Sequence, residues 1–407
     1  MSSAKRWAIL LLLYVAQGLP FGFFVQAMPA IMREQGVEHR YIGFMSLLAL
    51  PWALKFLWAG WVDRSQLLGI GHRKGWILAT NTVAVVSVAL LALAPMDWWL
   101  GQGIVVFLMM ILLLNLSASV QDISTDALAV ETIPVERRGI ANTVQVGGYR
   151  VGMVIGGGAI LAWLPVAGWQ WSMFAMACIL FVASASVLFW GQERAPVSKE
   201  GSFKSFKGLM VQPGFGLWVA FLLLYKAGDA FGTAMIKPMM IDLGYTLNDV
   251  AWMMGTWGVS AGLVGAVLGG LLVAPLGRYR ALLLFAVMQT ASLALYALGG
   301  LGSFSKDGLL AVIVIEHVTG GMATIALFTV MMDRCRSTHA GVDYSFQACL
   351  IVIATILLGS VSGLSVEFMG YAAHFMIASA LTFAAVIWLL LGGPSVVRQL
   401  EKRHENA

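Results

Sequence analysis

Twelve long apolar runs divide this sequence, and they restrict its fold more than any other feature does. Each run is close to the ~20 residues with which an α-helix crosses the hydrocarbon core of a bilayer. Only 11% of the residues are charged and 59% are hydrophobic, whereas a water-soluble domain needs far more polar surface. We therefore predict an all-α membrane protein with twelve transmembrane helices. The runs lie at residues 7–31, 41–62, 76–95, 102–130, 140–163, 170–190, 215–240, 247–274, 280–299, 308–332, 342–366 and 371–391.

A polar stretch near the middle of the chain separates the runs into two sets of six. It reads "GQERAPVSKEGSFKSFKG" (191–208) and predicts a cytoplasmic linker. Sparse identities relate the two sets, because Gln145 and Gly157 recur as Gln347 and Gly359 at one common spacing. Two parallel six-helix repeats are the major facilitator architecture, with a solute site near the midplane. The predicted parts are a six-helix bundle at 1–190, a linker at 191–212, a second six-helix bundle at 213–393 and a cytoplasmic tail at 394–407.

The basic residues predict the orientation of the chain in the membrane. If the N-terminus is cytoplasmic, eighteen Lys and Arg residues fall in inner loops and tails, against Arg33, Arg40 and Lys306 outside. This positive-inside bias places both termini in the cytoplasm. The net charge of +5 therefore reflects topology. A nucleic-acid partner is not expected, because it would need the basic residues on one folded face.

Ionisable side chains form a stripe along the seventh run. Lys226, Asp229, Thr233 and Lys237 recur at i, i+3, i+7 and i+11, so this helix face should line water or protein. At ~1.5 Å per residue, Lys226 and Asp229 lie near the midplane, as does Arg150 of the fifth run, and Lys237 lies near the outer rim. Lys226 and Asp229 either only neutralise each other, or Asp229 takes up a proton with Lys226 or Arg150 as counter-charge. Burial favours the neutral carboxyl and a nearby cation favours the carboxylate, so moving the cation would switch the proton.

A second stripe runs along the fourth apolar run. It consists of Asn115, Ser119, Asp122 and Asp126. One interpretation is a gate network near the cytoplasmic mouth, in which Asp126 pairs with Arg137 or Arg138 of "PVERRG". The other is a proton exit path.

Two further polar residues and a set of glycines lie in other runs. Glu316 and His317 are adjacent in the tenth run and so ~100° apart on a helix, and we expect either to face a cavity alone. Gly148, Gly152 and Gly156 recur every four residues and predict close helix packing. The "GLP" of "AQGLPFG" would soften the first helix where it bends.

Several motifs resemble the AmpG-like permeases of the major facilitator superfamily, a group that includes muropeptide permeases and acetyl-coenzyme A transporters. They are "GLPFGFF", "MREQGV", "IGFMSLLALPWALKFLWAGWVDR", "HRKGW", "SASVQDISTDA", "ERRGIANTVQVGGYRVGM" and "LLYKAGDAFGTAMIKP", in family order over nearly the whole chain. The resemblance implies twelve to fourteen helices, an inner-membrane location and proton-driven uptake into the cytoplasm. The residues of this chain that fall on the family's motifs are Lys55, Asp63, Arg64, Gln121, Asp122, Asp126, Arg150, Lys226 and Asp229.

Departures from the muropeptide pattern favour another branch of this group. The fourth-helix motif continues as "DALAVE" where muropeptide permeases usually have Asp-Ala-Tyr-Arg, and the chain stops at twelve runs. With "DRCRSTHAGVDYSFQ", these features look more like the RhtX/FptX-type siderophore permeases. The loop motif of the superfamily is also altered, because an insertion is expected to separate Arg73 and Lys74 from Asp63.

The predicted function is an inner-membrane secondary transporter that imports a bulky polar periplasmic solute with protons by alternating access. A ferric siderophore is the favoured solute, and an anhydro-muropeptide of cell-wall recycling is the alternative. We expect a monomer in the lipid bilayer, with no cofactor and no metal, since the six His and three Cys residues form no metal motif. An intramembrane enzyme or a channel is the alternative from another class, but the sequence has no hydrolase elbow and no repeated filter motif.

The candidate residues fall into three groups by expected role. Those for proton coupling are Asp229, Glu316, Asp122 and Asp126. Those for substrate binding are Arg150, Lys226, Tyr225, Gln145, His317, Gln347 and Tyr149. Those for the gate and loop motif are Lys55, Asp63, Arg64, Arg73, Lys74, Arg137, Arg138, Asp333 and Arg334.

Overall fold

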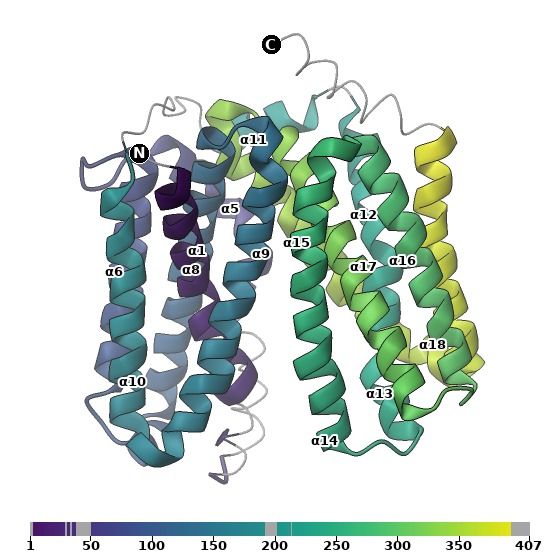
Figure 1. The fold of residues 1–407 in the computed structure, drawn as a ribbon. Coiled ribbons are helices and arrows are strands. Elements are labelled where there is room, and N and C mark those ends of the chain that lie inside the picture. The colour runs from purple at the N-terminus through teal and green to yellow at the C-terminus, as the bar shows by residue number, and fades with distance from the viewer. Residues whose placement is uncertain are drawn as a thin grey trace. The chain divides into compact units, whose positions relative to one another are not determined.

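The structure is a computed structural model, and it describes residues 3–28, 31–32, 35–37, 50–191, 202–212 and 214–391. Regular structure in these residues is entirely helical (Figure 1). The chain forms two compact units. The first consists of Met1–Thr132, Val144–Lys207 and Cys335–Cys349, and the second of Ile133–Thr143, Gly208–Arg334 and Leu350–Ala407.

The helices of the first half of the chain are, in order, α1 (Ser3–Pro20), η1 (Phe21–Ala27), α4 (Leu50–Leu54), α5 (Phe56–Arg64), α6 (His72–Leu91), α7 (Met96–Leu100), α8 (Ile104–Thr132), η2 (Val135–Arg137), α9 (Arg138–Val154), η3 (Ile155–Ile160), α10 (Leu161–Ala185) and η4 (Ser186–Phe189). Within the first unit, α6 packs against α8 and α10, and α1 packs against both of these. Apolar side chains of these helices, such as Phe24, Phe107 and Met173, form its core.

The helices of the second half are α11 (Ser202–Met210), α12 (Phe215–Thr233), α13 (Ile236–Asp242), α14 (Leu247–Val250), η5 (Ala251–Gly258), α15 (Val259–Leu276), α16 (Arg278–Gly300), α17 (Lys306–Asp333), η6 (Ser337–His339) and α18 (Ala340–Leu391). Within the second unit, α17 packs against α15 and α16, and α16 also contacts α12.

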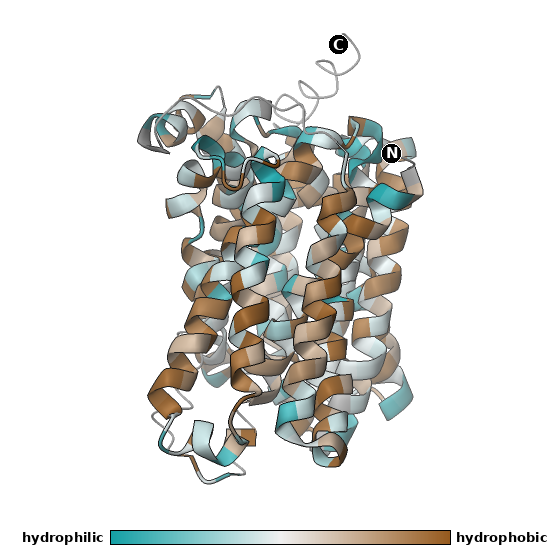
Figure 2. Ribbon diagram, turned by 90° about the vertical axis from the view of Figure 1, so that its left-hand side faces the viewer, coloured by the Kyte–Doolittle hydropathy of each residue, from teal (hydrophilic) through white to brown (hydrophobic). Residues whose placement is uncertain are grey.

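Hydrophobic residues cover the middle of the helices and hydrophilic residues are more frequent near their ends (Figure 2). Exposed apolar side chains such as Val105, Phe181 and Leu271 fit contact with lipid.

Nine helices in the described residues are long and apolar enough to cross a membrane. Two of them, Val135–Phe189 and Ala340–Leu391, each contain a glycine with non-helical backbone angles. Gly168 has φ 79° and ψ 170°, and Gly370 has φ 77° and ψ 168°, a conformation that is almost confined to glycine. Each glycine lies in a gap predicted between two apolar runs. The predicted run at 41–62 is described from residue 50 onward, as α4 and α5.

The repeat that the sequence indicates is also present in the helix boundaries. The starts of α8 and α17, of η2 and η6, and of α9 and α18 are each separated by the same interval as Gln145 and Gln347. The two turn glycines, Gly168 and Gly370, have this spacing as well. The later parts of the two halves therefore follow one plan, as the two glutamines predict.

Glycines bring the backbones of α1 and α9 into direct contact, as their four-residue spacing predicts. A methyl group on Gly152 would overlap the carbonyl oxygen of Val15, and one on Gly156 would overlap that of Leu19. Where this contact continues, α1 passes into the π-helical η1 just after Pro20, and α9 passes into η3. The expected softening near the "GLP" of the first helix thus coincides with a change of helix type.

The α1–α9 contact gives a first prediction. Gly152→Leu should lower the free energy of unfolding by at least ~3 kcal/mol, because a side chain there meets backbone that has no room to move. The thermal midpoint of purified protein in detergent measures this change. Gly147→Leu is the matched control, because no atom lies within 4 Å of a methyl group at that position of the same helix. Equal midpoints for the two variants would contradict the proposed role of the glycine contact.

Candidate functional site

The Lys226 and Asp229 side chains of α12 contact each other in the second unit. Their charged atoms form an ion pair, and Gln289 Nε2 of α16 donates a hydrogen bond of 2.7 Å to Asp229 Oδ1. Lys226 Nζ also donates to Thr324 Oγ1 of α17 at 3.3 Å. The side chains of Lys226 and Asp229 are 11% and 19% exposed, so neither is fully buried.

Close packing on the opposite side of α12 determines this orientation. A methyl group on Gly228 would overlap the carbonyl oxygen of Ala378, so α12 lies directly against α18 there. Lys226 and Asp229 consequently face α16 and α17. The rest of the predicted stripe does not take part, because Thr233 bonds back to the carbonyl of Asp229 and Lys237 is exposed. An exposed lysine at a helix end fits the predicted position near the rim.

Glu316 and His317 of α17 form a second pair in the same unit, and this corrects the sequence analysis. His317 Nδ1 lies 2.8 Å from Glu316 Oε2 and 2.9 Å from the carbonyl oxygen of Ile313. Their side chains leave the helix in different directions, as expected for neighbours, but the two flexible side chains turn toward each other. The two side chains therefore do not point apart, whereas the expectation that one of them faces a cavity alone stays a prediction.

One cation and two carboxylates meet in the interior of the first unit. Lys55, at the junction of α4 and α5, forms an ion pair with Asp122 of α8, and its Nζ lies 4.0 Å from Asp126 Oδ2. The side chains of Lys55, Asp122 and Asp126 are 6%, 8% and 1% exposed. The interior of this unit thus holds two buried carboxylates against a single cation.

Neutral polar groups complete this cluster around Asp126. Its Oδ1 accepts hydrogen bonds of 2.9 Å from the Tyr14 hydroxyl and 2.7 Å from Gln145 Nε2, and Tyr344 in turn donates to Gln145 Oε1 at 3.1 Å. The sequence predicts that Asp126 pairs with an arginine of "PVERRG". The Arg138 guanidinium bonds Asp333 instead. Asp126 lies well inside α8, more than one turn before its end at Thr132, where Tyr14 and Gln145 reach it.

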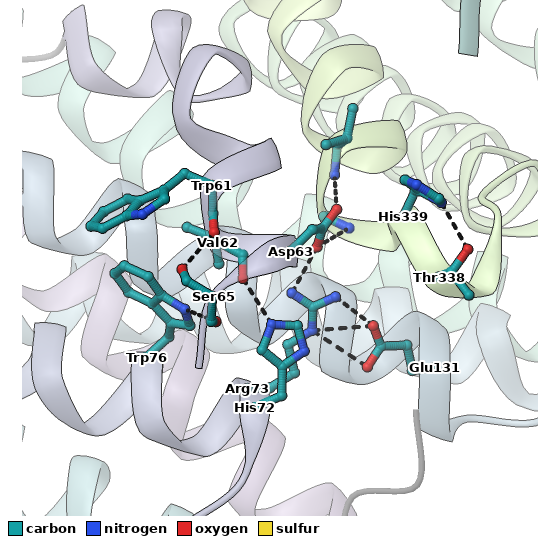
Figure 3. A network of polar contacts seen from close by, with 12 residues as sticks. Trp61, Val62, Asp63, Ser65, His72, Arg73, Trp76, Glu131, Thr338 and His339 are labelled. Carbon is teal, nitrogen blue, oxygen red and sulfur yellow. Dashed lines mark hydrogen bonds and ion pairs between the residues drawn. The ribbon is translucent and has the colours of Figure 1, made fainter. Parts of the chain in front are cut away.

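Asp63 and Arg73, two of the residues predicted for the gate, are buried in direct contact. Arg73 Nη1 lies 2.7 Å from Asp63 Oδ1, and Arg73 also donates to Glu131 at the end of α8, at 2.5 Å (Figure 3). Asp63 accepts hydrogen bonds from the backbone N–H groups of Gly341 and Val342, at 3.2 and 2.9 Å. These donors lie in the first turn of α18, where a carboxylate stabilises the exposed N–H groups and the helix dipole.

The expected separation of Arg73 from Asp63 is therefore wrong. The connection between α5 and α6 folds back on itself, because a ring nitrogen of His72 contacts the carbonyl of Val62 at 2.8 Å. Trp76 Nε1 also donates to the carbonyl of Ser65 at 2.8 Å (Figure 3). The longer connection thus brings the start of α6 back to Asp63.

The second unit contains a related charge cluster around Asp333, at the end of α17. Its carboxylate accepts 2.8 Å and 2.9 Å hydrogen bonds from Arg138 at the start of α9 and Arg278 at the start of α16. Arg278 also donates to the carbonyl of Val135. Asp333 occupies the position that Glu131 has in the first repeat, so the two halves each place an arginine-bonded carboxylate at this helix end.

The contact between Asp63 and Arg73 gives a second prediction. Asp63→Asn should destabilise the folded protein by ~3 kcal/mol or more, because Arg73 is 1% exposed and loses one of its two carboxylates. Melting of the purified variant measures the effect. Asp97→Asn, an exposed carboxylate in α7, is the control and should melt like the original protein. A melting temperature of Asp63→Asn equal to this control would exclude a stabilising role.

The other candidates occupy varied positions. Tyr225 is buried and donates to the carbonyl of Leu282, and Gln347 donates to the carbonyl of Asp343, so both bond main-chain groups of their own unit. Tyr149 contacts the rings of Phe21 and Trp52. The remaining positions are Arg150 and Lys74, which are half-buried, Arg334, which stacks over Trp218, and Arg64 and Arg137, which are exposed.

Sequence reasoning missed several partners of the charged residues. They are Tyr14, Glu131, Gln289, Thr324 and Tyr344, each contributed by another helix. A glutamine in the apolar run 280–299 was a signal for Gln289, since an amide within the bilayer needs a partner. Among the described residues no group of three His, Cys, Asp or Glu side chains is placed to hold a metal ion.

Comparison with known proteins shows the family of the chain. The family described as Major Facilitator Superfamily matches residues 10–341. The chain belongs to the major facilitator superfamily. An anhydromuropeptide permease of Escherichia coli strain K12 is 30% identical over 400 residues, which cover 95% of this chain and 79% of that permease. A Rickettsia conorii protein that carries the name AmpG 4 is 25% identical over 395 residues, which cover 93% of this chain and 94% of its own length.

Solved structures of the superfamily have the same fold. The human organic anion transporter MFSD10 matches with a TM-score of 0.75 at 14% identity, over 96% of this chain and 100% of its own. A bacterial homologue of the iron transporter ferroportin, in an outward-facing state, matches with a TM-score of 0.72 at 15% identity, over 96% and 99%. The predicted fold class and the resemblance to AmpG-like permeases are confirmed. The protein is thus a multi-pass membrane transporter by family.

Proposed function

We propose that this chain is a proton-coupled importer of anhydromuropeptide-type solutes in the bacterial inner membrane. The observation that carries the proposal is the 30% identity to an anhydromuropeptide permease, which extends over 95% of this chain. Both termini would lie in the cytoplasm, because the basic residues favour that orientation. The protein would act as a monomer, with two six-helix bundles at 1–190 and 213–393.

The contacts of α12 support a role for Lys226 in solute binding. An anhydromuropeptide carries sugar hydroxyls and peptide carboxylates, and a partly exposed ammonium can pair with such a carboxylate. When Lys226 turns to the solute, Asp229 loses its cation and gains affinity for a proton. Solute and proton would therefore bind together. Arg150 of the first unit is a second candidate for the solute carboxylates.

The buried cluster of Lys55, Asp122 and Asp126 supports a second proton-binding place. It holds two carboxylates against one cation, and Gln145 bonds Asp126 from α9. The networks around Asp63 and Asp333 would act as gates, because both join the ends of several helices. Alternating access then needs these bonds to open once in each cycle.

A ferric siderophore is the second candidate solute, which the sequence analysis placed first. The features that favour it are "DALAVE" at 126–131 and the resemblance of 333–347 to siderophore permeases. The named relatives favour the muropeptide instead, and one of them is an anhydromuropeptide permease. We therefore place the muropeptide first.

Uptake by intact cells distinguishes the two solutes. The chain would be expressed in a host without its own muropeptide and siderophore permeases, and its outer membrane made permeable. Cells would receive either radiolabelled anhydromuropeptide or iron-labelled siderophore. We expect uptake of the first above that of cells with an empty vector, and no uptake of the second. The reverse result would refute the proposed substrate.

A further inference from the structure

Two ionisable pairs lie close together in the second unit, and only one of them has a role so far. Lys226 and Asp229 form the first pair on α12, and Glu316 and His317 form the second on α17. The Glu316 side chain is 4% exposed, whereas that of His317 is 20% exposed. The imidazole is therefore the more exposed part of this second pair.

The two pairs meet beside Gly320, where the side chain is missing. A methyl group on Gly320 would lie 3.2 Å from Glu316 Oε1, 3.4 Å from Gln289 Nε2 and 3.8 Å from Asp229 Oδ1. The two carboxylates are therefore at most about 7 Å apart, a span that one or two water molecules bridge. Gln289 donates to Asp229 and so faces the same place.

Ionisable side chains near Glu316 lie on α12 and α16 as well as on α17, where His317 follows it. From α16 the hydroxyl of Tyr296 is within electrostatic range of Glu316. Asp229 lies on α12, together with the Lys226 ammonium that pairs with it. On the side of η5, the imidazole Nε2 of His317 lies against Gly258, 2.8 Å from where a methyl group on that glycine would be.

These contacts place the two faces of His317 in different surroundings. Its Nδ1 forms a hydrogen bond with the carbonyl oxygen of Ile313 and lies 2.8 Å from Glu316 Oε2, a buried oxygen that forms no hydrogen bond with the described residues, and its Nε2 lies on the other side of the ring. An imidazole can accept a proton at one nitrogen and release another proton from the opposite nitrogen. This geometry allows a proton that is taken up at Nε2 to leave from Nδ1 toward Glu316 Oε2.

We propose that His317 and Glu316 deliver the proton that Asp229 takes up when solute binds. The inference rests on the proposed function and adds the route to it. When Lys226 turns to a carboxylate of the solute, the solute covers Asp229 from the side of Lys226. Rotation of the protonated Glu316 carboxyl then points its O–H toward Gly320. The O–H bond of Glu316 breaks and one forms on Asp229 Oδ1 through bridging water, and His317 restores the proton from solvent.

Stopped-flow proton uptake by the purified protein tests this route. Anhydromuropeptide is mixed with protein in weakly buffered solution that contains a pH-sensitive dye. The wild-type protein should take up about one proton per solute. In Glu316→Gln the amplitude should remain, because Asp229 still binds the proton, while the rate falls at least about tenfold. Glu367→Gln, an exposed carboxylate of α18, is the matched control and should keep the wild-type rate.

A second variant acts on the space between the carboxylates and leaves both of them in place. Gly320→Ala should also slow proton uptake at least about tenfold with its amplitude kept, because the methyl group occupies the path. Gly363→Ala is its control, since no atom lies within 4 Å of a methyl group there. Wild-type rates in both Glu316→Gln and Gly320→Ala would overturn the route, as would loss of amplitude in Glu316→Gln. Absence of proton uptake by the wild-type protein would instead refute the proposed coupling itself.

Discussion

Asp229→Asn should abolish accumulation of solute against its gradient, while the protein remains folded and inserted in the membrane. Lys226 and Gln289 both contact the Asp229 carboxylate. The amide of asparagine has nearly the same shape but cannot take up the proton. Without coupling free energy, the ratio of inside to outside solute should fall to about one. Labelled solute in proteoliposomes with an imposed pH gradient measures this ratio.

The matched control for this change is Asp307→Asn. Asp307 is an exposed carboxylate in the first turn of α17, so its loss alters the same charge far from any buried pair. It should accumulate solute like the original protein. Accumulation by Asp229→Asn that equals this control and still responds to the pH gradient would show that another group carries the proton.

Lys55→Met should destabilise the protein by about 3–5 kcal/mol, because it leaves the Asp122 and Asp126 carboxylates buried without their cation. The side chains are of similar length, so little packing is lost. The thermal midpoint in detergent at neutral pH would report the change. Lys237→Met removes an exposed lysine and should leave the midpoint nearly unchanged.

A double-mutant cycle separates the ion pair from other effects of Lys55→Met. Lys55→Met combined with Asp122→Asn removes both partners, so it should be more stable than Lys55→Met alone. The energy recovered is the penalty of the unpaired carboxylate. If the two single effects simply add, Lys55 does not stabilise the fold through Asp122.

The fold was predictable because the bilayer restricts it. An apolar run of about 20 residues has few alternatives to a spanning helix, so the gaps that contain Gly168 and Gly370 were located from hydropathy alone. The spacing of Gln145 and Gln347 also indicated the repeat that the boundaries of α8 and α17 share. Local pattern and global structure agree at these points.

The candidate site was predictable only where the contact lies within one helix. The i, i+3 spacing of Lys226 and Asp229 placed them on one face, and they pair. Contacts between helices were not predictable, since nothing in the sequence near Asp126 names Tyr14 or Gln145 as its partners. Glu316 and His317 were misjudged for a related reason.

The contact between Glu316 and His317 was not predicted because the direction of each side chain was inferred from its position on the helix alone. The ~100° between neighbours describes α-carbons, whereas three rotatable bonds let the Glu316 carboxylate reach the imidazole of His317. The same applies to Arg73, whose long side chain and folded connection bring it to Asp63 and Glu131. Charged side chains within a low-dielectric interior find partners over such distances because isolation is costly.

Transport by the unaltered protein tests proton-coupled import most directly. Purified protein in proteoliposomes would be given labelled anhydromuropeptide, with the outside more acidic than the inside and with or without an uncoupler. We expect accumulation above the outside concentration, which collapses to equal concentrations when the uncoupler is added. Solute that only equilibrates, or that accumulates equally with the uncoupler, would contradict proton-coupled import.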